Sequence, residues 1–244
     1  MIYLQQKLSY SPEVLKYYHL SGEVVSYFVF IIAIIAIYNF KKFNSYYLWL
    51  FINICLSAIL ELLSIFLSKS GVVNNQYINH IYLFQEIVTL GIFYFYVFKD
   101  ERIKMLSKYF LGLLSISVII NAIWKEGYMA IPAKFALIES ILFSICGVIL
   151  FRELITKSKI GLYRKSPIFW FNLYILSTFL SITLFFLVID KALMVSDNLA
   201  MILYIIKNSI GVLFYIFWIV GALKLKRTTP TSSLKPSQQP RERN

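Results

Sequence analysis

Seven long apolar runs dominate the sequence and restrict the chain to a membrane-spanning fold. A bilayer core of about 30 Å needs about 20 apolar residues in a helix. The fourth run is the weakest, because Ser115, Ser117 and Asn121 interrupt it. The seven runs cover residues 22–39, 47–67, 78–98, 106–124, 133–151, 167–189 and 199–223. They predict an all-α fold, a polytopic bundle of seven transmembrane helices.

The composition excludes a soluble fold. Of the 244 residues, 59% are hydrophobic and 15% are charged, and the mean hydropathy is +0.71. A typical soluble domain is about 45–50% apolar and about 25% charged. The net charge of +12 is distributed over short connections between the runs, so we expect the lipid bilayer, and no nucleic acid, as the partner. No connection is long enough to hold a soluble domain.

Three regions follow from the distribution of the apolar runs. Residues 1–21 are expected to be an extramembrane lead, because Pro12 and Glu13 interrupt this segment before the first run. Residues 22–223 form the predicted transmembrane domain. Residues 224–244 are basic and rich in Pro and Ser, so we expect a disordered tail.

The positions of Lys and Arg predict the orientation of the bundle. Of the 24 Lys and Arg residues, 17 lie on one side of the bundle, in alternate connections and in the tail. Six lie on the opposite side, and Lys207 lies inside the seventh run. Cytoplasmic loops carry the excess of positive charge, so we place the N-terminus outside and the C-terminus in the cytoplasm. The abundance of Ile, Lys, Asn, Phe and Tyr, typical of AT-rich coding sequences, favours a bacterial inner membrane.

Four ionisable residues deep inside the runs are the candidate site: Glu61, Glu86, Glu139 and Lys207. Such residues are costly in lipid and usually mark a functional site or a pairing partner. With alternating spans, all four lie roughly 9–13 Å below the outer membrane edge, at 1.5 Å per residue. We therefore predict one layer of three acids and one base in the outer half of the bilayer.

Helical spacing predicts that polar residues of three runs face inward. They recur at steps of three or four residues, which places them on one helix face. The faces are Asn53, Ser57, Glu61, Ser64 and Ser68; Asn79, Tyr82, Glu86, Thr89 and Tyr96; and Lys207, Gly211, Trp218 and Gly221. The glycines would let another helix approach closely. His80, Gln85 and Asn208 adjoin the layer, and we expect them to belong to the same polar cavity or packed polar core.

Two roles for the layer remain open at this point. Lys207 could form a structural ion pair with one glutamate, or extend toward the outer headgroups. Alternatively, the layer could be a ligand-binding or proton-handling site. We favour a site, because three acids exceed what one lysine neutralises.

Several chemistries are set aside by the residues themselves. A lysine in the seventh helix facing acids resembles the retinal site of microbial rhodopsins. That family has an acid four positions before the lysine, whereas this chain has Leu203, and no arginine lies inside any run. His19 and His80 are the only histidines, so no His-rich metal site is expected. We expect no cofactor, no metal and no catalytic residue.

The expected function is that of a sensor, receptor-like or accessory membrane protein for a small ligand, a lipid or pH. It would act on a separate cytoplasmic or membrane signalling partner, through the basic segment 152–166 and the tail. The alternatives are a proton-coupled transporter of small solutes and an intramembrane enzyme that modifies lipid with a glutamate as general acid or base. Of these, a non-enzymatic role is favoured.

Overall fold

A computed structural model describes residues 11–43, 46–71, 77–124, 133–157 and 162–225. Its seven α-helices are α1 (Pro12–Tyr38), α2 (Tyr47–Lys69), α3 (Tyr77–Val97), α4 (Glu101–Trp124), α5 (Ala133–Lys157), α6 (Pro167–Val195) and α7 (Asp197–Lys224). Two short 3-10 helices lie in the connections: η1 (Phe40–Lys42) between α1 and α2, and η2 (Leu162–Lys165) between α5 and α6. All seven α-helices are long and apolar enough to cross a membrane, and the described ranges contain no strand. The predicted all-α seven-helix fold is confirmed, and the orientation of the termini stays a prediction.

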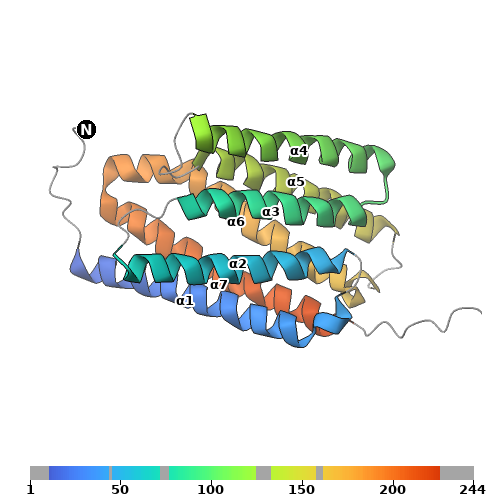
Figure 1. Ribbon diagram of the computed structural model, residues 1–244, viewed down its shortest axis with the longest axis horizontal. Helices are drawn as coiled ribbons and strands as arrows, with labels where there is room; N and C mark the ends of the chain where they lie inside the picture. Colours follow the sequence, from blue (N-terminus) through green and yellow to red (C-terminus); the bar gives the residue numbers. More distant parts are fainter. Residues whose placement is uncertain (1–10, 44–45, 72–76, 125–132, 158–161, 226–244) are drawn as a thin grey trace, which may run out of the picture.

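The seven α-helices lie side by side along the long axis of the molecule (Figure 1). Helices adjacent in sequence pack together from α1 to α4 and from α5 to α7. Helix α7 also packs on α1, and α3 packs on α5, which closes a ring around the interior. The main neighbour of α4 is α3, so α4 lies outside this ring. The interior is therefore bounded by every membrane-spanning helix except α4.

Four helices extend at least five residues beyond the apolar runs that predicted them: α1, α4, α5 and α6. Pro12 begins α1 and does not break it, because the first turn of a helix does not need the missing proline N–H. Helix α5 continues to Lys157 and α6 to Val195, so parts of the expected connections are helical. Hydropathy marks the lipid-facing length, whereas a helix continues into water. Of the predicted lead and tail, residues 1–10 and 226–244 lie outside the described residues.

The polar residues of the fourth run do not interrupt α4. The Ser115 hydroxyl donates to the Leu111 carbonyl at 2.8 Å, and the Ser117 hydroxyl donates to the Leu113 carbonyl at 2.8 Å. Each serine therefore satisfies its hydroxyl within the helix, which lowers the cost of placing it in lipid.

Packed aromatic rings fill the half of the bundle in which α7 ends. Trp218 is 2% exposed and lies 6.1 Å from the Phe43 ring and 5.6 Å from the Phe171 ring. Fully buried Asn172 joins three helices here, because it accepts from the Tyr94 hydroxyl at 3.0 Å and donates to the Gly147 carbonyl at 2.9 Å. This half has the packing of a structural core.

The two glycines on the predicted inward face of α7 have different environments. A Cβ at Gly221 would lie 2.9 Å from the ring of Phe171, so α6 and α7 approach closely there. A Cβ at Gly211 would meet nothing within 4 Å. The close approach expected from the glycines is therefore found at Gly221 and not at Gly211.

We expect Gly221→Ala to destabilise the protein by about 1–2 kcal/mol, because the fully buried Phe171 ring has to move. Gly211→Ala is the matched control on the same helix, and it is expected to be neutral or to stabilise by up to about 1 kcal/mol, since alanine favours the helix. Equilibrium unfolding of both purified variants in SDS measures the difference. Equal stability of the two would contradict the close packing of α6 and α7.

Candidate functional site

A central cavity of about 280 Å³ lies inside the ring of helices. Four predicted site residues line it: Glu61, Glu86, Lys207 and Asn208. They come from α2, α3 and α7, and the walls from α1 and α6 complete the enclosure. The full lining is Val25, Val29, Asn53, Ile54, Ser57, Glu61, Tyr82, Glu86, Tyr174, Thr178, Ser181, Ile182, Lys207, Asn208, Gly211 and Tyr215.

A second cavity of about 410 Å³ adjoins the first. The two cavities share four lining residues: Tyr82, Glu86, Ile182 and Lys207. The rest of the second lining is Tyr18, Asn79, Leu83, Ala136, Glu139, Phe185, Phe186 and Tyr204. Glu139 is only 3% exposed, and its Oε1 has no hydrogen-bond partner among the described residues. A buried carboxyl oxygen without a partner is costly unless water or a ligand contacts it.

Lys207 lies at the junction of the two cavities and forms no ion pair with the glutamates. Its Nζ lies 5.6 Å from the centre of the Phe185 ring and 5.9 Å from that of Tyr204, which are cation–π contacts. No carboxyl oxygen of Glu61, Glu86 or Glu139 lies within 4.0 Å of Lys207 Nζ. The counter-ion role expected for Lys207 is therefore not met by a direct contact.

Glu86 lines both cavities and, within the part of the chain that the structure describes, makes no hydrogen bond or ion pair. Glu61 differs, because hydrogen bonds hold both of its carboxyl oxygens. The Ser26 hydroxyl from α1 contacts Oε1, and the Tyr82 hydroxyl lies 2.9 Å from Oε2 and 2.8 Å from the Ser57 carbonyl. Glu61 thus connects α1, α2 and α3, whereas the Glu86 carboxyl group remains available to a ligand.

Gln85 and His80 are buried next to the site and line neither cavity. Gln85 Nε2 donates to Ser57 Oγ at 3.1 Å, and nearby Asn53 Nδ2 donates to Thr89 Oγ1 at 2.8 Å. These bonds join α2 to α3 along the predicted polar faces. Part of the polar pattern is therefore helix–helix packing, and the cavity-lining part lies beside it.

Sequence reasoning missed the contributions of α1 and α6. Ser26 was overlooked because its immediate neighbours, Val25 and Tyr27, are hydrophobic residues of the first run. Tyr174, Thr178 and Ser181 line the central cavity at steps of four and three, and this spacing in the sixth run was a readable signal. Tyr215 follows Lys207 and Gly211 on the same face of α7 and could have been found in the same way.

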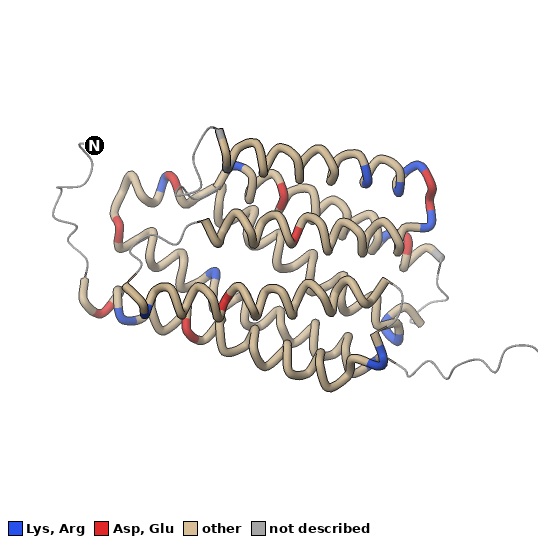
Figure 2. Tube along the Cα trace, viewed as in Figure 1, with Lys and Arg blue, Asp and Glu red and all other residues tan. Residues whose placement is uncertain are grey.

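Most charged residues lie near the ends of the helices, where a membrane protein meets water. Figure 2 shows Lys and Arg mostly at the two ends of the bundle, with a few acidic positions and a basic position within its length. The structure brings Glu61, Glu86, Glu139 and Lys207 around two adjoining cavities.

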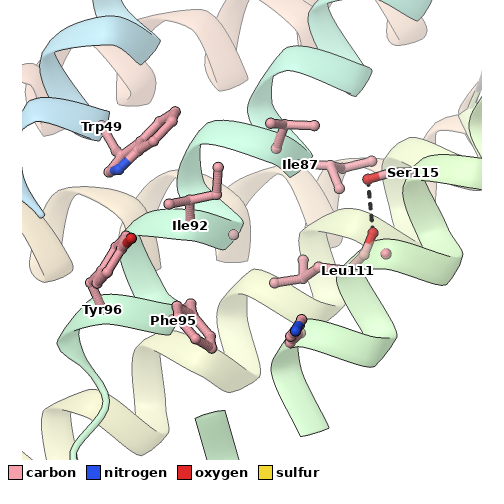
Figure 3. A pocket seen from close by; sticks show the side chains of 11 residues that line it. Trp49, Ile87, Ile92, Phe95, Tyr96, Leu111 and Ser115 are labelled. Carbon is pink, nitrogen blue, oxygen red and sulfur yellow. Dashed lines mark hydrogen bonds between the residues drawn. The ribbon is translucent and has the colours of Figure 1, made fainter. Parts of the chain in front are cut away.

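An apolar groove of about 420 Å³ lies between α3 and α4 (Figure 3). Ile87, Ile92 and Leu111 line it, together with the side chain of Trp49 from α2. Tyr96, expected on the inward face of α3, is 55% exposed and lines this groove instead. No glutamate lines the groove, so it is separate from the candidate site.

Compared with known protein families, with curated proteins and with solved structures, the chain matches none of them. The class of the protein therefore rests on its own fold and site. That class is an integral membrane protein of seven apolar helices with polar cavities inside the bundle.

Proposed function

We propose that this protein is a receptor-like, non-enzymatic membrane protein that binds a small ligand in its two cavities. One observation carries the proposal: Lys207 and Glu86 line the same two cavities, and neither forms an ion pair with a described residue. A purely structural ion pair would bring the two groups into contact, because an isolated charge in the membrane is costly. Opposite charges that line the same cavities without a direct contact are suited to a ligand that contacts both.

The charges define the class of ligand as a zwitterion. An anionic group of the ligand would contact Lys207, and an ammonium group would contact Glu86, with Glu139 as a second acceptor. Charge-assisted hydrogen bonds of this kind are roughly twice as strong as neutral ones. The aromatic rings of Phe185 and Tyr204 line the same cavity and add a surface for the cation.

The packing of the bundle favours a receptor over a transporter. A transported solute has to leave through the half in which α7 ends, and the packed rings of Phe43, Phe171 and Trp218 fill that half. Opening such a route would require those buried rings to separate. A ligand that enters and leaves on one side needs no such change.

Transmission to a partner would use α7, which runs without a break from the cavity to Lys224. Lys224 Nζ lies 5.8 Å from the ring of Trp170, and Trp170 Nε1 donates to the Arg164 carbonyl at 2.8 Å. A shift of α7 at Lys207 would therefore reach η2 in the basic segment. This end is the proposed cytoplasmic side, and a bacterial inner membrane remains the proposed location.

The test is thermal stability of the purified protein in the presence of small zwitterions, with phosphoethanolamine and a set of amino acids as probes. A binding zwitterion should raise Tm in a concentration-dependent manner, as expected for a ligand that binds only the folded state. Lys207→Met and Glu86→Gln should each weaken the apparent Kd by at least about tenfold, as expected for the loss of a charge-assisted contact.

Two controls accompany this test. Acetate and methylamine each carry only one of the two charges and should give much smaller shifts. Lys191→Met removes an exposed lysine of α6 and should leave the apparent Kd unchanged. If no zwitterion shifts Tm, or if the protein reconstituted in liposomes accumulates the zwitterion inside them, the receptor proposal is wrong.

A further inference from the structure

One hydrogen bond separates the central cavity from a groove on the outer face of the bundle. Asn208 Nδ2 on α7 donates to Ser21 Oγ on α1 at 3.1 Å. Asn208 lines the central cavity on its inner side and the groove on its outer side, and Ser21 lines the groove. The wall between the polar interior and the surroundings is therefore one pair of side chains thick at this position.

The groove has a volume of about 440 Å³ and is almost wholly apolar. Its walls come from α1 and α7, the helices that close the ring. The lining includes Leu20, Val24, Ile202, Ile205 and Val212. Val24, Ile205 and Val212 of the lining belong to the apolar runs, so we expect this part of the groove to face the acyl chains, whereas Val14 and Tyr17 belong to the predicted lead.

We propose that the ligand of the central cavity is a zwitterionic amphiphile of the bilayer, which enters sideways between α1 and α7. Its headgroup occupies the central cavity, and its acyl chain lies in the groove. This inference rests on the proposed function and specifies the class of its ligand.

Charge complementarity supports this occupant. The central cavity holds the ammonium of Lys207 and the carboxyl group of Glu86, which match a headgroup with one anionic and one cationic group. The adjoining groove matches an apolar chain. A water-soluble zwitterion would need only the cavity, so the groove next to Asn208 distinguishes the two ligand classes.

The central cavity has open space beside Asn208 on α7. A Cβ at Gly211, which lines this cavity three residues after Asn208, would meet nothing within 4 Å. Above and below, Tyr18 contacts Tyr204 at 5.8 Å and Phe28 stacks on Tyr215 at 6.2 Å. These ring contacts hold the two helices together while the Asn208–Ser21 bond opens.

The experiment compares two probes with the same headgroup on the purified full chain. Lysophosphatidylethanolamine, below its micellar concentration, carries one acyl chain, and glycerophosphoethanolamine carries none. We expect the lysolipid to bind at least tenfold more tightly. Val24→Trp, which fills the groove, should weaken the lysolipid at least tenfold and leave glycerophosphoethanolamine unchanged. Ile205→Trp fills the same groove from α7 and is a second variant in case Val24→Trp does not fold.

The matched control is Gly112→Trp, which fills the separate groove between α3 and α4 shown in Figure 3. It should change neither affinity. The inference is overturned if both probes bind equally, if both groove variants retain the lysolipid affinity, or if Lys207→Met binds the lysolipid as tightly as the wild type. If the wild type binds neither probe and no zwitterion shifts Tm, the proposed function fails together with this inference.

Discussion

Trp218→Ala is expected to lower the free energy of unfolding of this protein by about 3 kcal/mol, at the lower end of the range for Trp to Ala changes in cores. Trp218 is 2% exposed and packs between Phe43 and Phe171. In a membrane the hydrophobic effect does not drive helices together, so the loss is mainly one of van der Waals contacts around a new cavity. Equilibrium unfolding in SDS, followed by circular dichroism, measures the change.

The control for this variant is Leu213→Ala, also on α7. Leu213 is 59% exposed and faces lipid, so its removal should cost less than about 0.5 kcal/mol, within the usual range for surface substitutions. A loss below about 1 kcal/mol for Trp218→Ala, or equal losses for both variants, would contradict a rigid aromatic core in this half. This half of the bundle could then open to let a transported solute leave, as a transporter requires.

Lys207→Met is expected to raise the free energy of unfolding by about 1 kcal/mol. A lysine at membrane depth costs about 2.5–3.5 kcal/mol, and its contacts with the rings of Phe185 and Tyr204 return up to about 2 kcal/mol. Methionine has a similar length and carries no charge, so the variant removes the cost and keeps most of the packing. A stabilising change at a residue needed for binding is the usual sign of a functional site.

The same unfolding measurement distinguishes the two roles of Lys207. The double variant Lys207→Met with Glu86→Gln should be no less stable than Lys207→Met alone. If Lys207→Met destabilises the protein and Glu86→Gln restores the loss, the two residues form a structural ion pair and the ligand proposal loses its basis. Lys191→Met, at an exposed position of α6, should leave the stability unchanged.

The seven helices could be predicted because lipid imposes a strict rule on the backbone. Every N–H and C=O must be satisfied within a helix, so a run of about 20 apolar residues leaves few alternatives. The ends of α5 and α6 could not be predicted in this way. Residues 152–157 and 190–195 are more polar, and their helical state follows from continuation of the helix beyond the lipid.

The candidate site was predicted in part. Helical spacing identified Glu61, Glu86 and Lys207 as inward-facing, since a 3.6-residue period places them on defined faces. Spacing along one helix does not give the distance between side chains of different helices. Only the structure could therefore show that Lys207 forms no ion pair with the glutamates. Gln85 is the opposite case, because a bond to Ser57 makes it part of the packing between α2 and α3.

The sequence by itself determined the class of the protein, the seven spans and the few charged residues held within them, because hydropathy and helical period are properties of a single segment. The tertiary structure decided what those charges face. Whether Lys207 contacts a carboxylate or the rings of Phe185 and Tyr204 depends on how α3, α6 and α7 are spaced across the bundle. Whether Asn208 separates the central cavity from the groove depends on the packing of α1 against α7, two helices far apart in the chain.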